Sequence, residues 1–174
     1  MTGTGERIIG LIWAQDRNRT IGVDGGLPWR IPEHFEHFHD VTDGRPIIMG
    51  HHTWNSLPEQ VRHSPTRRNI VLTHTPDQSD CPVETATTLA EALALTYPRE
   101  TWIIGGGETL CQAMPFATTL AVTEISAHAN GDTSAPHIPV RDFMLAYTIG
   151  PRESSNPGLT YEFRSYVHRP STVR

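Results

Sequence analysis

Two glycine-containing turns in the sequence have the residue types that bind phosphate groups. In "IIGGG" (103–107) an apolar run passes into three glycines and then into the start of a helix. Backbone N–H groups in such a turn can meet a pyrophosphate without a Cβ in the way. In "MGHHTW" (49–54) the hydroxyl of Thr53 lies in the first turn of a helix, where it can cap the helix or bind a phosphate oxygen. A tight strand-to-helix turn can require glycine even where no ligand binds. Phosphate binding and a purely structural role therefore both stay open for these two turns.

A short helix supplies side chains that could hold a flat heterocycle. The segment "PEHFEHFHDV" (32–41) places His34, Phe35 and Phe38 on one inward face. Aromatic rings there can sandwich a heterocycle, or they can pack into the core. A metal site is not expected, because His39 is turned away from His34 and His37 and no cysteine or carboxylate is spaced to complete a tetrahedron.

These side chains need an α/β framework to bring them together. Four apolar runs are short enough to be strands buried on both faces, as in a parallel sheet: 7–14, 45–50, 67–73 and 101–106. Helices are predicted over about 32–41, in a short segment after Gly50, over 88–95, and from the glycines before Glu108. The later runs are expected to add antiparallel strands at one edge, because no ten-residue helix separates them: 119–127, 143–150 and 159–168. The long connection Ala14–Trp29 is typical of a lid.

Length and composition limit the classes of function. The 174 residues fit a single domain, for which we expect a core over 7–168 and a frayed tail over 169–174. A formal net charge of -5, without clustered basic residues, favours a small-molecule partner over nucleic acid or a membrane surface. The two cysteines, Cys81 and Cys111, are too few for a disulfide framework, and the N-terminus lacks a secretory pattern, so we expect a cytoplasmic protein. No apolar stretch approaches the roughly 18 residues that a membrane span needs.

Six segments carry a family resemblance when they are taken in chain order: "IIGLIWAQDRNRTIGVDGGLPWRIPE", "RPIIMGHHTWNSLP", "RRNIVLT", "WIIGGG", "VTEI" and "NGDT". Their order and spacing resemble dihydrofolate reductase from about Ile8 to Val167. The resemblance implies a three-layer α/β fold with a mostly parallel eight-stranded sheet, an antiparallel C-terminal edge and about four flanking helices. It also implies a monomer that transfers a hydride from NADPH to C6 of dihydrofolate, protonates N5, and binds antifolate inhibitors.

The resemblance also implies a substrate site. Catalytic roles would belong to His34, Trp29 and Thr123, with Thr123 reaching the pterin edge through a water. Phe38 would stack on the pterin and benzoyl portions, and Arg67 would clamp the α-carboxylate. Substrate-binding positions would be Ile12, His34, Phe35, Phe38, Leu57, Ser64, Arg67, Ile104 and Thr123.

A cofactor site follows from the same resemblance. The lid would span Asp16–Leu27, and Asp132 would belong to the loop that holds this lid closed. Cofactor-binding positions would be Ala14, Ile21, Gly22, Gly50, His51, His52, Thr53, Leu72, Thr73, His74, Ile104, Gly106, Gly107, Glu108, Thr109 and Leu110.

The main departure from the family pattern is His34, which stands where the family has Asp or Glu. A carboxylate accepts two parallel hydrogen bonds from a pterin, whereas imidazole has no such fork. Burial and the positive end of the helix dipole should keep His34 neutral at pH 7. We therefore expect weaker binding of diaminopyrimidine inhibitors. Glu33 is expected to point toward solvent and complement the helix N-terminus.

Other departures affect cofactor and substrate preference. His51 stands where the family has an arginine for the 2′-phosphate side, and His74 occupies another phosphate-contact position, so discrimination between NADPH and NADH should be modest. Leu110 replaces a tyrosine, and Ser64 and Thr66 replace a leucine and a glycine. Two alternatives stay open: a reductase of the same fold that acts on another pterin or a pyrimidine precursor, and a catalytically weak binder of folate or nucleotide.

Overall fold

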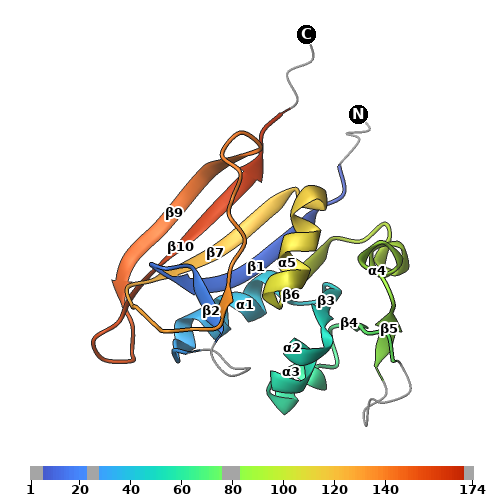
Figure 1. The fold of residues 1–174 in the computed structure, drawn as a ribbon, viewed down its shortest axis with the longest axis horizontal. Helices are drawn as coiled ribbons and strands as arrows, with labels where there is room; N and C mark the ends of the chain where they lie inside the picture. Colours follow the sequence, from blue (N-terminus) through green and yellow to red (C-terminus); the bar gives the residue numbers. More distant parts are fainter. Residues whose placement is uncertain (1–5, 23–27, 76–82, 171–174) are drawn as a thin grey trace.

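An eight-stranded sheet forms the centre of the protein in the computed structural model, which describes residues 6–22, 28–75 and 83–170 (Figure 1). In spatial order the strands are β5 (Glu84–Ala86), β4 (Asn69–Leu72), β3 (Ile47–Gly50), β6 (Thr101–Gly105), β1 (Ile9–Asp16), β7 (Thr119–Ile125), β10 (Thr160–His168) and β9 (Phe143–Glu153). Neighbours from β5 to β7 pair in parallel, and β10 is antiparallel to both β7 and β9. The predicted mostly parallel sheet with an antiparallel C-terminal edge is confirmed.

Strand β7 corrects one expectation, because it runs parallel to β1 instead of antiparallel. The crossover that makes this possible lies before the strand, in helix α5 (Gly107–Ala113) and the 3-10 helix η2 (Met114–Phe116). A parallel connection needs about a dozen residues, and the segment between β6 and β7 supplies them. The resulting register sets Thr123 opposite Ala14.

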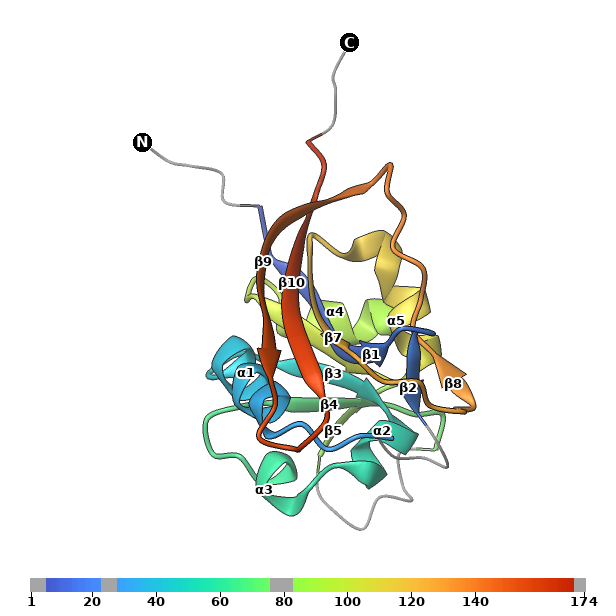
Figure 2. The same ribbon diagram turned by 90° about the vertical axis from the view of Figure 1, so that its left-hand side faces the viewer.

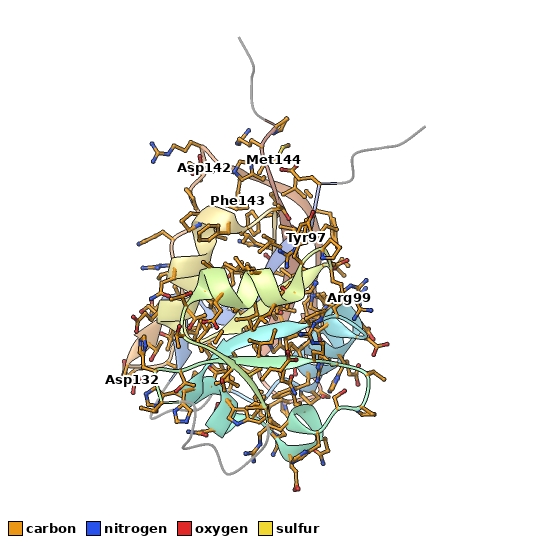
Figure 3. The ribbon with its side chains drawn as sticks, turned by 90° about the vertical axis from the view of Figure 1, so that its right-hand side faces the viewer. Tyr97, Arg99, Asp132, Asp142, Phe143 and Met144 are labelled. Atoms are coloured by element: carbon orange, nitrogen blue, oxygen red, sulfur yellow. The ribbon has the colours of Figure 1, made fainter. Side chains whose placement is uncertain are left out.

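Helices cover both faces of the parallel part of the sheet, where most residues are buried, whereas β9 is almost entirely exposed. On one face α4 (Leu89–Thr96) and α5 pack on Leu11, Ile48 and Leu120. On the other face lie α1 (Pro32–Thr42), α2 (His51–Ser56) and α3 (Glu59–Arg62), which pack on residues such as Ile12 and Met49. Figure 2 shows α1 beside the β9–β10 end of the sheet, and Figure 3 shows α4 lying across the opposite side. Helix α3 is one element that the sequence pattern did not predict.

The described part of the predicted lid includes strand structure. Strand β1 continues to Asp16, and β2 (Thr20–Gly22) pairs with β8 (Thr133–Ser134) in a separate two-stranded sheet. The N–H of Asp132 donates to the carbonyl of Gly22 at 3.1 Å, so the lid and the "NGDT" segment are joined as expected. Residues 23–27 of the predicted lid lie outside the described residues.

Asp16 fastens the beginning of this segment. Its buried carboxylate accepts hydrogen bonds from the backbone N–H groups of Asn18, Thr20 and Ala129 at 2.8, 2.9 and 2.6 Å. Burial by itself raises the pKa of Asp16, but these bonds outweigh it and bring the pKa below its usual value. The first turn of the lid is therefore held by an ionised carboxylate.

Arg169, the first residue of the predicted tail over 169–174, is bonded to the segment before β9. Its backbone N–H donates to the carbonyl of Asp142 at 2.7 Å, and its Nε donates to the carbonyl of Val140 at 3.0 Å. Residues 171–174 lie outside the described part of the chain.

Candidate active site

A cleft of about 590 Å³ lies where β1 and the end of β6 meet the first turns of α1, α2 and α5. Its volume is in the range of small-molecule binding sites, about 300 to 1,000 Å³. The predicted site residues that line it are Ile12, Ala14, Ile21, Gly22, Trp29, His34, Phe35, Phe38, His52, Thr53, Leu57, Ile104, Gly106, Gly107 and Leu110. Residues predicted for the substrate site and for the cofactor site, from distant parts of the sequence, thus share one cavity.

At the centre of the cleft, His34 makes one hydrogen bond to the sheet. The side chain lies in the first turn of α1 with 9% of the residue exposed, and its Nδ1 is 2.9 Å from the Thr123 hydroxyl oxygen on β7. Burial, and to a smaller extent the nearby His37, lower the pKa of His34 to about 4. His34 is therefore neutral at pH 7, as predicted. Thr123 is fully buried behind His34 and does not line the cleft.

Glu33 has a partner that the sequence did not predict. Its carboxylate accepts a hydrogen bond from the Ser154 hydroxyl at 2.9 Å and one from the Ser155 backbone N–H at 2.6 Å. The Ser155 bond is the main cause that lowers the pKa of Glu33 to about 2. The expectation that Glu33 simply points to solvent is wrong, because the β9–β10 turn reaches the N-terminus of α1 and supplies two donors (Figure 2).

His37 packs against the sheet. Its ring stacks on Phe163 of β10 with centroids 4.1 Å apart, and burial lowers the pKa of His37 while Asp40 partly raises it. Within the described residues, no group of three or more histidine, cysteine, aspartate or glutamate side chains comes together in a way that could hold a metal ion.

The three glycines at 105–107 have different structural environments. Gly105 has a φ of +142°, which favours glycine, and a Cβ at Gly107 would lie 2.9 Å from the carbonyl oxygen of Ser134. Packing does not require glycine at Gly106, where the nearest atom to a Cβ would be the Thr53 hydroxyl at 3.5 Å. The space in front of Gly106 belongs to the cleft. Backbone conformation and close packing therefore explain the glycines at 105 and 107. Gly106 needs another explanation, and its position at the open cleft supports a role in binding phosphate.

Thr53 lies against this turn. The N-cap residue of α2 is Gly50, so Thr53 is the third helical residue and does not fill the capping position. Neither α2 nor α5 has a side chain that caps its first turn. The backbone N–H groups at both turns and the Thr53 hydroxyl can therefore serve an anionic ligand.

Arg67 is buried beside the aromatic wall, with 7% of the residue exposed. Its Nη1 donates to the Thr42 hydroxyl at 2.7 Å, and its guanidinium carbon lies 5.2 Å from the centre of the Phe38 ring. Within the described residues, its Nε and Nη2 have no hydrogen-bond partner. Burial lowers the pKa of Arg67, and Asp43 partly opposes this. Two free N–H groups on one side of a buried guanidinium form the fork that a carboxylate occupies.

Several predicted site residues do not line the cleft: Gly50, His51, Ser64, Arg67, Leu72, Thr73, His74, Glu108, Thr109 and Thr123. Arg67 lines a separate pocket of about 170 Å³ together with Arg68 and Arg99. Gly50 packs on Thr109, whose hydroxyl would lie 3.1 Å from a Cβ at Gly50. Glu108 accepts a hydrogen bond from Gln112 along its own helix, and the Ser64 and Thr66 hydroxyls lie 3.3 Å apart.

Sequence reasoning missed other lining residues: Trp13, Pro28, Arg30, Ser56, Pro58, Val61, Gly105 and Thr133. Ser56 lies one residue before the predicted Leu57, and Thr133 one residue after Asp132, so proximity to a predicted residue was the available signal.

The described helices include none that is long and apolar enough to cross a membrane.

Comparison with known proteins agrees with this geometry. The chain matches the sequence model of the family described as dihydrofolate reductase over residues 8–168. It is 42% identical over 162 residues to dihydrofolate reductase from Mycobacterium tuberculosis (strain H37Rv), which covers 93% of this chain and 98% of that protein. It is 41% identical over 160 residues to the enzyme from Neisseria meningitidis serogroup A, which covers 91% of this chain and 97% of that one.

A solved structure shows the same fold. Dihydrofolate reductase from Enterococcus faecalis, complexed with NADP(H) and RAB-propyl, superposes with a TM-score of 0.84 at 26% identity and covers 95% of this chain and 98% of that chain. The sequence match, the relatives and the fold agree, and the chain belongs to the dihydrofolate reductase family.

Proposed function

We propose that this protein reduces dihydrofolate to tetrahydrofolate with NADPH, by hydride transfer to C6 and protonation at N5. The observation that carries this proposal is the single cleft that joins the Gly106 turn to the buried His34 and its aromatic neighbours. The relatives named dihydrofolate reductase and the neighbour solved with NADP(H) support it.

The cofactor side of the cleft fits NADPH. Gly106 leaves open the volume that a Cβ would fill, and the first turns of α2 and α5 have free backbone donors for phosphate. When bound, NADPH supplies the hydride. Holding it would fall to Ala14, Ile21, Gly22, Ile104 and Leu110 near the reactive ring, to Gly106, Gly107, Glu108 and Thr109 at the pyrophosphate, and to Gly50, His51, His52, Thr53, Leu72, Thr73 and His74 on the adenylate side.

The substrate side combines apolar walls with two polar anchors. Phe38, Phe35 and Leu57 line the cleft and can enclose the pterin and benzoyl rings, with Ile12, Ile104 and Trp29 completing the walls. The free fork of Arg67 binds the α-carboxylate, and Ser64 lies on the same side. His34 meets the pterin edge.

Protonation at N5 cannot draw on a charged His34 at neutral pH. With a pKa of about 4, only about one molecule in a thousand carries the imidazolium at pH 7. The proton therefore comes from solvent through the cleft, and His34 orients the substrate. Loss of the carboxylate also weakens the binding of diaminopyrimidine inhibitors, which pair as cations with that carboxylate.

We further propose that the enzyme works as a cytoplasmic monomer. The residues assigned to substrate and cofactor all come from one chain, so the cleft is complete without a second copy. The exposed free thiol of Cys111 suits a reducing compartment.

Steady-state oxidation of NADPH with dihydrofolate, measured from pH 5 to pH 8, tests the proposed function. We expect turnover that falls as pH rises, because the proton is taken from solvent while His34 stays neutral over this range. Binding of both ligands without turnover at any pH would instead favour a folate or nucleotide binder. Turnover only with another pterin or a pyrimidine precursor would favour the alternative reductase.

A further inference from the structure

The hydrogen bond between His34 and Thr123 has a direction, and that direction decides what His34 offers to a ligand. Nδ1 of His34 and the hydroxyl oxygen of Thr123 are 2.9 Å apart, and either group can donate in principle. If Nδ1 carries the proton, Nε2 is left as an acceptor. If the hydroxyl donates to Nδ1, the neutral ring carries its proton on Nε2 and presents a donor.

The surroundings of Thr123 favour one direction. Thr123 is 0% exposed, and within the described residues its hydroxyl has no hydrogen-bond partner other than His34. A proton on Nδ1 would leave the Thr123 O–H buried without an acceptor. A buried donor without a partner is costly, whereas an unused lone pair on a hydroxyl oxygen is commoner and cheaper. The hydroxyl therefore donates, and Nδ1 accepts.

We propose that Thr123 fixes His34 in the tautomer protonated on Nε2, so that the cleft selects ligand edges that place a hydrogen-bond acceptor against this N–H. The nature of these ligands rests on the proposed function, but the tautomer does not. Thr123 is then a positioning residue, because it acts on the ligand only through His34.

The Nε2–H donor changes how heterocycles fit. A pterin edge that presents N3–H and the 2-amino group would place its own donors against the Nε2–H donor of His34, which is unfavourable. The edge that contains N1 presents a lone pair that can accept a hydrogen bond from Nε2–H. A neutral diaminopyrimidine can likewise accept at N1, but its N1-protonated cation cannot. The site therefore binds diaminopyrimidines in the neutral form, and a carboxylate at the same position would bind the cation.

Nitrogen-15 NMR of the ligand-free protein tests the tautomer directly. Histidine-selective labelling at pH 7.5, with His34→Gln to assign the signals, distinguishes a protonated from an unprotonated ring nitrogen. We expect His34 with the proton on Nε2 and a bare Nδ1. A proton on Nδ1, or equal amounts of both tautomers, overturns the proposal. This result does not depend on which reaction the enzyme catalyses.

Two substitutions of Thr123 test whether its hydroxyl fixes the tautomer of His34. Thr123→Val removes the hydroxyl at nearly constant volume, so the His34 signals should shift toward a mixture of tautomers. Thr123→Ser keeps the hydroxyl and should preserve the wild-type signals. An unchanged tautomer in Thr123→Val would show that Thr123 does not fix it. If Thr123→Val does not fold, the wild-type spectrum still decides the tautomer.

The ultraviolet spectrum of a bound diaminopyrimidine tests whether the site binds the neutral form, because the neutral and protonated forms of the ligand absorb differently. We expect the neutral form on the wild-type protein and the protonated form on His34→Asp. The protonated form on the wild type would overturn the claimed selection. Absence of NADPH oxidation with dihydrofolate would count against the proposed function alone, since neither spectrum requires turnover.

Discussion

The two sides of the proposed site both carry histidines, but these histidines differ in burial. At the proposed pterin end His34 is 9% exposed, bonded to the sheet through Thr123, and has a pKa lowered to about 4. At the proposed adenylate end the exposed His52 lines the cleft, whereas the half-buried His51 and the exposed His74 lie outside its lining. A desolvated site disfavours a charged imidazolium. Burial therefore makes His34 a neutral hydrogen-bonding group, whereas the histidines at the other end are open to solvent.

The largest effect should appear in the pH dependence of stability. Because the folded state lowers the pKa of His34 from 6.5 to about 4, the unfolded state binds more protons between these values. The free energy of unfolding should therefore rise with pH across this window, and His34 should account for a loss of about 3 kcal/mol when pH falls through it. Urea unfolding of the wild type and of His34→Gln, compared at several pH values from 4 to 7.5, measures this difference.

An exposed histidine on the same helix gives the matched control. His39→Gln should leave the wild-type pH dependence of stability in place, because His39 is exposed at the far end of α1. Parallel pH profiles for the wild type and His34→Gln would mean that His34 titrates alike in the folded and unfolded protein.

Restoring a carboxylate at the pterin end should strengthen inhibitor binding almost as much. His34→Asp would allow a charge-assisted pair with a diaminopyrimidine cation, worth roughly 2 to 3 kcal/mol, or about 30-fold to 150-fold in affinity. It should also raise turnover at neutral pH, since a carboxylate favours the protonated pterin in the transition state. Inhibitor titration and steady-state kinetics measure both effects. If neither changes, another residue handles the pterin.

The sequence predicted these two ends unequally, and the reason is physical. Helical periodicity places His34 and Phe38 on the cleft side, so local geometry was enough for these two. Ile12 and Ala14 were expected from the family resemblance instead, and Trp13 between them, which also lines the cleft, was missed. Neutral His34 also followed from its type and burial. The partners of Glu33 and Arg67 could not be predicted, because Ser154 and Thr42 reach them only through the tertiary fold. The direction of β7 was mispredicted because its crossover precedes the strand.

Removing the proposed carboxylate clamp should affect substrate binding alone. Arg67→Leu deletes the two N–H groups that are free among the described residues, so we expect the KM for dihydrofolate to rise more than tenfold. NADPH affinity should stay nearly unchanged, because the Arg67 guanidinium contacts Phe38 and Thr42 of α1, and none of the proposed cofactor positions lies on that helix. Steady-state kinetics measure the KM for dihydrofolate, and titration with NADPH measures cofactor affinity separately.

The neighbouring Arg68 provides a control of the same residue type. Its guanidinium is already paired with Glu84 at 2.6 Å, and both side chains are partly exposed. Arg68→Leu should therefore leave the KM within about twofold of the wild type, as expected for loss of a surface ion pair. An unchanged KM in Arg67→Leu as well would favour a substrate without that carboxylate.

At the adenylate end the expected effect is smaller. His51 and His74 should contact the 2′-phosphate of NADPH, which NADH lacks, and exposed contacts of this kind contribute only about 0.2 to 1 kcal/mol each. The double variant His51→Gln, His74→Gln should therefore lose a few-fold in selectivity for NADPH over NADH, as measured by titration of both nucleotides. His168→Gln on β10 should keep the wild-type selectivity. Equal selectivity in the wild type and the double variant would remove these histidines from the phosphate site.

The smallest effect should come from Glu33, which binds the β9–β10 turn outside the cleft. Glu33→Gln keeps the shape but loses the charge-assisted bonds from Ser154 and Ser155, so we expect a loss of about 1 kcal/mol at pH 7. Because the folded pKa of Glu33 is about 2, below its usual value of 4.5, this contribution is present above pH 4.5 and is lost as pH falls toward 2. Urea unfolding gives the free energy, and amide exchange at Ser155 should speed up in the variant. Glu36→Gln, at an exposed position of the same helix, should change neither quantity. Unaltered exchange at Ser155 would show that the turn is held by other contacts, such as the bond from Asn156 Nδ2 to the carbonyl of Arg30 at 2.8 Å.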